Sequence, residues 1–370
     1  MTATRSIAIV TGTRAEFGLL RPVIRAVEAH PDLNMQLIVT GTHNLPPAYT
    51  STEVEAEFKI AAKFQMQRPG EVGRISDVTA LGGGIQEFGG PLQSLSPDVV
   101  LVLGDRIEAF GAAAAAAVAG IRVAHMHGGD RAEGIADEAL RHAITKLAHL
   151  HLPATQQSAQ RIIAMGEDPQ RVHVVGSPAI DGLDEIARMA DAEYAALGKP
   201  EIVYLLHPTG RSPEREREDA GRLLDCCIRF GRTVALHPNH DPGREGILQA
   251  IDEASCPQAA HFPREKFVAL LRRARVVVGN SSAGLIECAA LGLPCVNVGS
   301  RQAGRERAGN VIDVPEWDRP RIEAAICEGI QRPITAIEHP YGDGRTGPRT
   351  ADVLAGFDAA SVPLTKRNTY

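Results

Sequence analysis

The sequence predicts an α/β protein built from two doubly wound, Rossmann-like domains. Its 370 residues are enough for two domains of ordinary size. Short apolar runs alternate with longer segments of helical periodicity, which is typical of a parallel sheet with helices on both faces. The alternation restarts in the second half of the chain, after a polar connector with helical and Gly-Pro features. The pattern therefore indicates two consecutive domains with a boundary near residue 180.

The predicted elements of both domains can be given in chain order. The first set of strands is Ile7–Val10, Leu37–Val39, Val99–Leu103, Arg122–His125 and His173–Val175, and helical periodicity is clear in Leu19–Ala29 and Asp137–Ala148. The second set of strands is Ile202–Leu206, Thr233–Leu236, Val276–Val278 and Cys295–Val298. Two such domains leave a cleft between them, and their ligands bind beyond the carboxyl ends of the strands. The loops that follow the strands are therefore the candidate sites of chemistry.

Composition excludes several classes of protein. An apolar fraction of 44% is too high for a mainly disordered chain, and a net charge of −6 argues against a broad nucleic-acid surface. Neither a signal-peptide core nor the roughly 20 apolar residues of a membrane helix is found. The six cysteines form no CxxC pair. We expect a cytoplasmic protein with reduced thiols and with no nucleic-acid or membrane partner.

Nucleotide fingerprints of two other enzyme classes do not fit. The one literal GxGxxG, at residues 342–347, follows no apolar strand, and a P-loop pattern is absent. These observations argue against an NAD-dependent dehydrogenase and a P-loop NTPase.

Two strand-end loops of the first domain carry charged side chains. The turn Thr11–Glu16 leads into a helix, so Arg14 is either an anion ligand or a surface residue. Asp105 and Arg106 follow a continuous apolar strand. Asp105 fits a general base, a ligand of a sugar hydroxyl, or a plain helix N-cap.

The next loop has the sequence HMHGGD, which places His125 and His127 on one face of the strand. No third ligand follows at a metal-site spacing, so we expect no metal. The two glycines after His127 predict a close approach of the backbone to a ligand.

The helix after this loop begins with acidic residues. Asp137 and Arg141 are four apart, so an ion pair within the helix is the simple explanation. The position of Asp137 and Glu138 beside the HxHGG loop instead favours acid–base chemistry. Proton transfer on two faces of a sugar requires acidic or imidazole groups that converge on one site.

In the second domain, two loops begin with His-Pro, at His207 and His237. Proline ends each strand and fixes the loop. Either histidine, or Asn239, is a phosphate ligand or a loop residue with its hydrogen bonds satisfied.

The most informative loop has the sequence GNSSAG and precedes the predicted helix Leu285–Leu291. Ser281, Ser282 and the backbone amides at this helix N-terminus would form an anion site. Glu287 is placed to accept hydrogen bonds from ribose hydroxyls, and Arg301 to reach the same phosphates. A capped helix with a structural glutamate is the alternative.

Nine motifs together resemble the hydrolysing UDP-N-acetylglucosamine 2-epimerases of bacterial sialic-acid pathways and, more loosely, the non-hydrolysing 2-epimerases. They are TGTRAEFG (11–18), LGDRIEAF (103–110), HMHGGDRAEG (125–134), DEALRHAITKLAHLH (137–151), LHPTG (206–210), HPNHD (237–241), VGNSSAGLIE (278–287), GSRQAGRERAGNVIDV (299–314) and HPYGDGRT (339–346). The resemblance covers nearly the whole chain and implies a GT-B fold with an interdomain cleft. The implied domains are 1–180 and 181–347, with a last helix, within 348–370, that returns to the first domain, and a homodimer is the implied assembly.

The resemblance also implies a mechanism without NAD or metal. UDP is eliminated across C1 and C2 of the sugar, and water adds to the 2-acetamidoglucal to give N-acetylmannosamine. Asp105 and Asp137 match acid–base residues of the family, and His207 matches an active-site histidine near the leaving phosphate. His127 stands where non-hydrolysing members carry a catalytic glutamate. With the loop analysis, we expect nucleotide or phosphate contacts from Arg14, Asn239, Ser281, Ser282, Glu287 and Arg301, and sugar contacts from Arg106, Asp130 and Glu138.

Several alternatives stay open. The donor is UDP-N-acetylglucosamine, a UDP-linked 2,4-diacetamido-2,4,6-trideoxy sugar, or a GDP-linked sugar, because the base-binding loop has no readable code. The GDR and HxHGG motifs disfavour a non-hydrolysing epimerase. A GT-B glycosyltransferase would need an acceptor, and Asp105 and Asp137 argue against a binding protein without catalysis.

Overall fold

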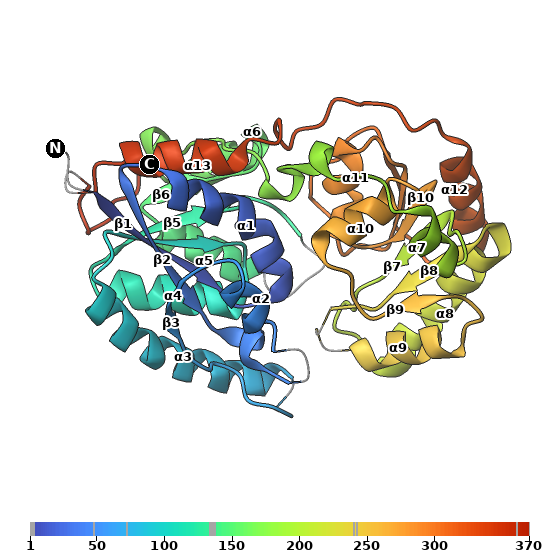
Figure 1. Cartoon of the computed structure of the whole chain (residues 1–370), viewed down its shortest axis with the longest axis horizontal. Coiled ribbons are helices and arrows are strands. Elements are labelled where there is room, and N and C mark those ends of the chain that lie inside the picture. The colour runs from blue at the N-terminus through green and yellow to red at the C-terminus, as the bar shows by residue number, and fades with distance from the viewer. Residues whose placement is uncertain are drawn as a thin grey trace. The chain divides into compact units, whose positions relative to one another are not determined.

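A computed structural model of the chain describes residues 4–46, 49–71, 73–132, 138–239, 241, 243–359 and 362–369. The chain divides into two compact units, each with a six-stranded parallel sheet. Unit 1 comprises Met1–Asp130, Ala136–Asp181 and Gly342–Tyr370, and unit 2 comprises Arg131–Ile135 and Gly182–Tyr341. The predicted class of two doubly wound parallel sheets is confirmed (Figure 1).

The sheet of unit 1 has the strand order β3-β2-β1-β4-β5-β6, which is the Rossmann order. Its strands are β1 (Arg5–Thr11), β2 (Leu33–Val39), β3 (Ile60–Lys63), β4 (Val99–Leu103), β5 (Arg122–Met126) and β6 (Leu150–Leu152). The direction of winding reverses between β1 and β4. Sheets of this kind bind ligands beyond the carboxyl ends of the strands at this point.

Helices cover both faces of this sheet because successive strand residues point to opposite faces. Ile7 and Ile9 of β1 belong to the core that contains α1 (Arg14–Ala29) and α13 (Thr346–Gly356). Figure 1 shows α13, in red, beside α1, in blue, although the two come from opposite ends of the chain. Ala8 and Val10 belong to the core on the opposite face of the sheet.

The other helices of unit 1 are η1 (Gly41–Asn44), α2 (Ser51–Glu55), α3 (Arg74–Leu95), α4 (Ile107–Val118), α5 (Glu138–Leu147), α6 (Gln156–Ala164), η2 (Pro169–Arg171) and η3 (Pro178–Ile180).

The sheet of unit 2 repeats this topology in the order β12-β11-β10-β7-β8-β9. Its winding reverses between β7 and β10. The strands are β7 (Ile202–Leu205), β8 (Thr233–Leu236), β9 (Gln258–Ala259), β10 (Val276–Gly279), β11 (Cys295–Val298) and β12 (Val311–Val314). The helices are η4 (Leu183–Glu185), α7 (Asp191–Ala196), α8 (Pro213–Phe230), α9 (Arg244–Glu253), α10 (Arg264–Leu271), η5 (Ser282–Gly284), α11 (Glu287–Ala290) and α12 (Arg319–Gln331).

The predicted strand His173–Val175 is wrong. This segment runs beside β6, but only Val172 forms a bridge, with His151. Pro153, which follows β6, accepts a hydrogen bond from the Val175 N–H at 3.1 Å. Proline has no N–H to donate in return, so the ladder stops there.

The predicted helix Leu285–Leu291 is also wrong as a single element. Only Glu287–Ala290 of this segment is helical, as α11, while the short helix η5 ends at Gly284, before the segment begins, and Leu285 and Ile286 lie between the two helices. A Cβ atom on Gly284 would collide with Sγ of Cys295 in β11. The close contact that this glycine permits explains why η5 lies tightly on the sheet.

No helix within the described part of the chain is both long enough and apolar enough to cross a membrane. All six cysteines carry free thiols.

Candidate active site

The carboxyl ends of β4 and β5 and the start of α5 bring polar side chains together in unit 1. We call Asp105, His127, Asp130, Glu138 and Arg141 the unit 1 cluster. The Arg141 guanidinium donates to the Asp105 carboxylate and, through Nη1, to the His127 carbonyl at 3.1 Å. Its Nε lies 3.7 Å from Oε2 of Glu138. Arg141 therefore ties the loops after β4 and β5 to α5.

This arrangement changes the interpretation of Arg141. The sequence offered Asp137 as its partner within the helix, but Asp137 lies outside the described residues. The structure pairs the buried Arg141 with Asp105, which is 36 residues away in the chain. No local spacing signals such a contact.

His127 is held through both ring nitrogens. Nδ1 lies 2.9 Å from Oδ2 of Asp130, and Nε2 lies 3.2 Å from Oγ of Ser177. Ser177 is fully buried, 50 residues further along the chain. Ser177 was not predicted, because no local sequence motif identifies it as a site residue.

His125 has a structural role. Its Nε2 lies 2.8 Å from the Gly104 carbonyl oxygen, and its Nδ1 lies 3.2 Å from Oγ1 of Thr145. Complete burial lowers the pKa of His125 to about 3, so the ring is neutral near pH 7 and donates to the carbonyl. This bond fixes the turn that leads to Asp105.

Among the described residues, no group of three or more His, Cys, Asp or Glu side chains is arranged to hold a metal ion.

The glycines after His127 allow close packing within the protein, and the predicted approach of a ligand to them stays a prediction. A Cβ on Gly128 would lie 2.9 Å from Nδ1 of His125 and 3.0 Å from Oγ1 of Thr145. A Cβ on Gly129 would collide with the Ser158 carbonyl, and φ of Gly129 is +73°. Both positions require glycine because neighbouring protein atoms occupy the space.

The two arginines of unit 1 that were predicted to contact the substrate, Arg14 and Arg106, have acidic neighbours near the ends of β1 and β4. Nη2 of Arg14 lies 2.8 Å from Glu53 of α2. Arg106 Nε lies 3.4 Å from Oε2 of the buried Glu108. The structure thus places Arg14 in an ion pair with α2, and Arg106 beside a carboxylate that sequence reasoning did not single out.

A second buried carboxyl group that the sequence analysis did not select, Glu16, lies in the first turn of α1. Burial raises its pKa to about 8, although a hydrogen bond from the Gly12 N–H at 2.6 Å opposes this shift. Glu16 N–H in turn donates to Oγ1 of the N-cap Thr13 at 3.2 Å. Glu16 thus accepts from the residue before the N-cap while its own N–H donates to the N-cap hydroxyl, an arrangement close to a capping box.

In unit 2, the loops after β7 and β10 are joined through Asn280. Its Oδ1 accepts from the His207 N–H at 2.7 Å, and its Nδ2 donates to the His207 carbonyl at 2.9 Å. Arg301 Nη1 donates to the Asn280 carbonyl at 3.3 Å. Gln302 donates to the same carbonyl at 2.9 Å. Asn280 and Gln302 were not predicted, although Asn280 lies in the GNSSAG motif.

The ring of His207 has a defined tautomer. The Asn239 N–H donates to Nδ1 at 3.1 Å, so in the neutral ring the hydrogen is on Nε2. Nε2 lies 3.3 Å from Oγ of Ser281. Burial, together with the positive charge of Arg301, lowers the pKa of His207 well below its usual value. His207 is therefore a neutral hydrogen-bond donor.

The structure brings four predicted residues of unit 2 into one network around Asn280, namely His207, Asn239, Ser281 and Arg301. Ser282 and Glu287 are the first residues of η5 and α11, and both are half-buried. We call these six residues the unit 2 site. The Asp241 carboxylate accepts from Asn239 Nδ2 at 2.5 Å and lies 3.8 Å from Arg301 Nη2. The donors of the network are neutral or cationic, which suits an anionic ligand.

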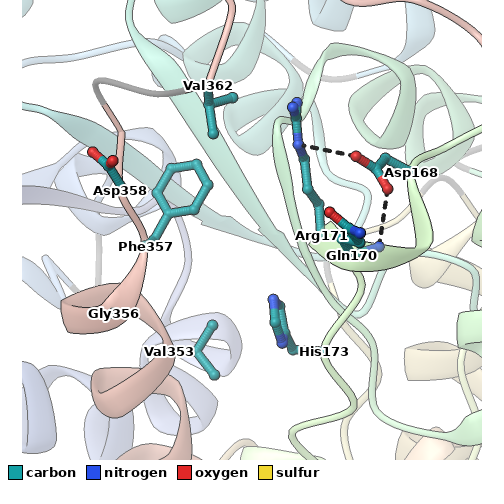
Figure 2. A pocket seen from close by; sticks show the side chains of 9 residues that line it. All are labelled: Asp168, Gln170, Arg171, His173, Val353, Gly356, Phe357, Asp358 and Val362. Carbon is teal, nitrogen blue, oxygen red and sulfur yellow. Dashed lines mark hydrogen bonds and ion pairs between the residues drawn. The ribbon is translucent and has the colours of Figure 1, made fainter.

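A pocket of about 420 Å³ lies elsewhere in unit 1 and contains none of the predicted site residues. Figure 2 shows Arg171 and His173 on one side of it and Phe357 on the other. Asp168 is engaged locally, since it accepts from the Gln170 N–H at 3.0 Å and lies 3.5 Å from Arg171. The residues that line this pocket include no member of the unit 1 cluster.

Comparison with known proteins relates this geometry to a family. The family model for UDP-N-acetylglucosamine 2-epimerase matches residues 25–355. The chain is 36% identical to the UDP-N,N'-diacetylbacillosamine 2-epimerase (hydrolyzing) of Legionella pneumophila, over 99% of this chain and 100% of the relative. It is 32% identical to the UDP-N-acetylglucosamine 2-epimerase of Neisseria meningitidis, over 98% of each chain.

Solved structures share the fold. The Neisseria meningitidis UDP-GlcNAc 2-epimerase bound to UDP-GlcNAc superposes with a TM-score of 0.80 at 19% identity, covering 95% of this chain and all of that one. The Methanocaldococcus jannaschii enzyme in complex with UDP-GlcNAc and UDP also gives 0.80, at 18% identity and with the same coverage. The predicted GT-B-like class is confirmed by these neighbours.

The sequence matches and the two Rossmann-like units define an enzyme that acts on nucleotide sugars. The chain belongs to the UDP-N-acetylglucosamine 2-epimerase family.

Proposed function

We propose that this protein is a hydrolysing 2-epimerase that releases UDP from a UDP-linked 2-acetamido sugar and inverts C2. UDP-N-acetylglucosamine, which would give N-acetylmannosamine, is one candidate donor. UDP-N,N'-diacetylbacillosamine is the other, because a relative with 36% identity over the full length is named for it. The observation that carries the proposal is the unit 1 cluster, in which Arg141 donates to both the Asp105 carboxylate and the His127 carbonyl, and both ring nitrogens of His127 are engaged.

In this proposal unit 2 binds the diphosphate of the donor. The neutral His207 and the Arg301 guanidinium supply donors, and Ser281 adds a hydroxyl. Donors that are fixed before the reaction stabilise negative charge as it develops on a leaving group. Glu287 is assigned to the ribose hydroxyls.

Unit 1 performs the chemistry on the sugar ring. The hydrogen at C2 is not acidic, so the bond between C1 and the phosphate oxygen must weaken first, with positive charge on the ring. A carboxylate stabilises this charge, and a base then takes the C2 proton. Asp105, Asp137 and His127 are assigned to these acid–base steps, and the hydration step returns a proton to the opposite face of C2.

A panel of donors tests this function. The purified enzyme is incubated with UDP-GlcNAc, UDP-N,N'-diacetylbacillosamine and GDP-linked donors, without any acceptor, and free nucleoside diphosphate is quantified. We expect free UDP together with a reducing 2-acetamido sugar. Release that depends on an added acceptor would support a glycosyltransferase, and a product that stays linked to UDP would support a non-hydrolysing epimerase.

A further inference from the structure

A group of charged side chains in unit 2 joins the loop after β7 to the first turns of α8. Glu216 and Asp219 of α8 are buried, with exposed fractions of 1% and 0%. Arg211 Nη2 donates to Oε2 of Glu216 at 3.2 Å, and Nη1 donates to Oδ2 of Asp219 at 2.6 Å. Arg215 Nε lies 3.3 Å from the same Asp219 oxygen, so two arginines compensate the two carboxylates. We call Thr209, Arg211, Glu216 and Asp219 the α8 clasp.

Glu216 fixes the backbone of the loop that carries His207. Its Oε1 accepts from the Thr209 N–H at 2.7 Å, from the Thr209 hydroxyl at 2.9 Å and from the Arg211 N–H at 3.3 Å. Arg211 Nε donates to Oγ1 of Thr209 at 2.9 Å. An ionised carboxylate only accepts and a guanidinium only donates, so each of these bonds has one possible direction. The clasp begins two residues after His207 and holds its loop in one conformation.

Arg211 also reaches the loop that carries Arg301, through the single tryptophan of the chain. Its guanidinium carbon lies 5.6 Å from the centre of the Trp317 ring, which is a cation–π contact. The indole lies against Gly299, where an added Cβ would be 3.3 Å from Nε1 of Trp317. Gly299 directly follows β11 and precedes Arg301 by two residues. Trp317 therefore links the clasp to the start of the Arg301 loop.

The loop after β8, which carries Asn239, approaches the clasp as well. A Cβ on Gly243 would lie 3.0 Å from Cγ of Glu216 and 3.3 Å from the Arg211 carbonyl oxygen. Gly243 has φ of +96°, in the region that favours glycine. Three loops that contribute residues to the unit 2 site thus pack on one group of compensated charges.

We propose that Arg211 and Glu216 are positioning residues for the diphosphate of the donor, an inference that rests on the proposed function. Arg211 is assigned to the loops and not to the phosphates, because each of its three side-chain nitrogens already donates within the clasp. The clasp keeps the donors of His207 and Arg301 in place before the ligand arrives. Less conformational freedom is then lost on binding, which increases affinity.

Binding of UDP and UMP to variants of the clasp tests this role. Arg211→Gln removes the cation, and Glu216→Gln removes the charge of the carboxylate that holds the loop. We expect the dissociation constant of UDP to rise about tenfold or more in each variant, and that of UMP to rise less. The two nucleotides differ by one phosphate, so a smaller preference for UDP locates the loss at the diphosphate. General damage to unit 2 would weaken both nucleotides equally.

Arg217→Gln is the matched control. Arg217 lies on α8, and its Nη2 donates to the exposed Glu253 at 2.7 Å. The change removes an ion pair of α8 outside the clasp, so we expect the affinities for UDP and UMP to stay at their wild-type values.

The fluorescence of Trp317 reports on the clasp without any ligand, since the chain has no other tryptophan. We expect Arg211→Gln to shift the emission to longer wavelength and to increase its quenching by acrylamide, because the indole loses its cationic neighbour. Arg217→Gln should change neither property. Arg211→Lys keeps the charge balance but cannot donate to all three partners, so it should change both properties in the same direction if Arg211→Gln does not fold.

A wild-type preference for UDP over UMP in Glu216→Gln and in the Arg211 variants would overturn the proposal. Nucleotide binding needs no turnover, so this failure is distinct from a failure of the proposed function. A reduced preference for UDP in an enzyme that releases no UDP from any donor would support the positioning role and contradict the hydrolysing 2-epimerase.

Discussion

The side-chain amide of Asn280 makes two hydrogen bonds with the backbone of His207, accepting from its N–H at 2.7 Å and donating to its carbonyl at 2.9 Å. The two residues follow β10 and β7, the strands between which the winding of the unit 2 sheet reverses. Such positions are where Rossmann-like sheets bind their ligands. Asn280 therefore holds the His207 loop in register with the loop that carries Ser281.

Asn280→Ala should damage both stability and ligand binding. The change leaves an N–H and a carbonyl of His207 without their partner, and each unsatisfied group costs about 1–3 kcal/mol. We expect the free energy of unfolding to fall by about 2–4 kcal/mol and UDP affinity to fall at least tenfold. Denaturant titration and calorimetry measure the two effects. Asn34→Ala, at an exposed position in unit 1, is the control and should change stability by about 0.5 kcal/mol or less.

Arg141→Lys should lower activity more than stability. Lysine keeps the charge near Asp105 but cannot also donate in fork geometry to the His127 carbonyl. We expect kcat to fall by about 10- to 100-fold, with destabilisation of about 1–2 kcal/mol. Arg222→Lys is the control: it changes an exposed arginine whose guanidinium donates to Glu218, and it should leave kcat unchanged. Equal rates for Arg141→Lys and the wild type would show that the two contacts of Arg141 do not matter for catalysis.

Two glycine-to-alanine changes should have opposite signs. In Gly129→Ala the new Cβ collides with the Ser158 carbonyl at a backbone φ of +73°, so we expect a loss of about 2 kcal/mol or more. Gly83 lies exposed in α3 with free space around the added Cβ. Gly83→Ala should stabilise the protein by about 0.5–1 kcal/mol, because alanine favours the helix. Thermal unfolding measures both, and a neutral Gly129→Ala would contradict the packing described for the HxHGG loop.

Buried neutral histidines should make unit 1 sensitive to acid. Burial lowers the pKa of His125 to about 3 and that of His43 to about 4, from 6.5 in the unfolded chain. The unfolded chain therefore takes up these protons first, so stability falls as the pH drops below about 6.5. The two residues together give a slope of roughly 3 kcal/mol per pH unit until the lower pKa values are reached.

Urea unfolding at pH 7, 6 and 5 measures this slope. His43 is fully buried, between the hydroxyls of Thr11 and Thr50. His43→Gln removes one of the two protons, so the slope should decrease by about 1.4 kcal/mol per pH unit. The same slope in His43→Gln and the wild type would show that His43 does not contribute.

The sequence was a good guide to the inner strands and a poor one to the edges. β4 is a continuous apolar run buried on both faces, and the predicted and observed bounds agree. β3 and β9, at edges of the two sheets, are short and mix alanine with lysine or glutamine. A strand that pairs on one side only is stabilised by its neighbour and not by its own apolar pattern, so periodicity does not reveal it.

The site shows the same division. Strand-end loops pointed to Asp105, His127 and His207 because chemistry in parallel sheets gathers at that edge. The residues that form hydrogen bonds with them could not be predicted from the local sequence. Arg141 and Ser177 contact Asp105 and His127 from 36 and 50 residues away, and only the folded chain places them together.

The most direct test of the proposed function is the reaction run in D2O, with the products analysed by mass spectrometry and NMR. Elimination followed by hydration places one deuterium at C2 of a free 2-acetamido sugar and leaves UDP unattached. We predict this result for UDP-GlcNAc or UDP-N,N'-diacetylbacillosamine. Free UDP with no deuterium at C2, or a deuterated sugar still linked to UDP, would contradict a hydrolysing 2-epimerase.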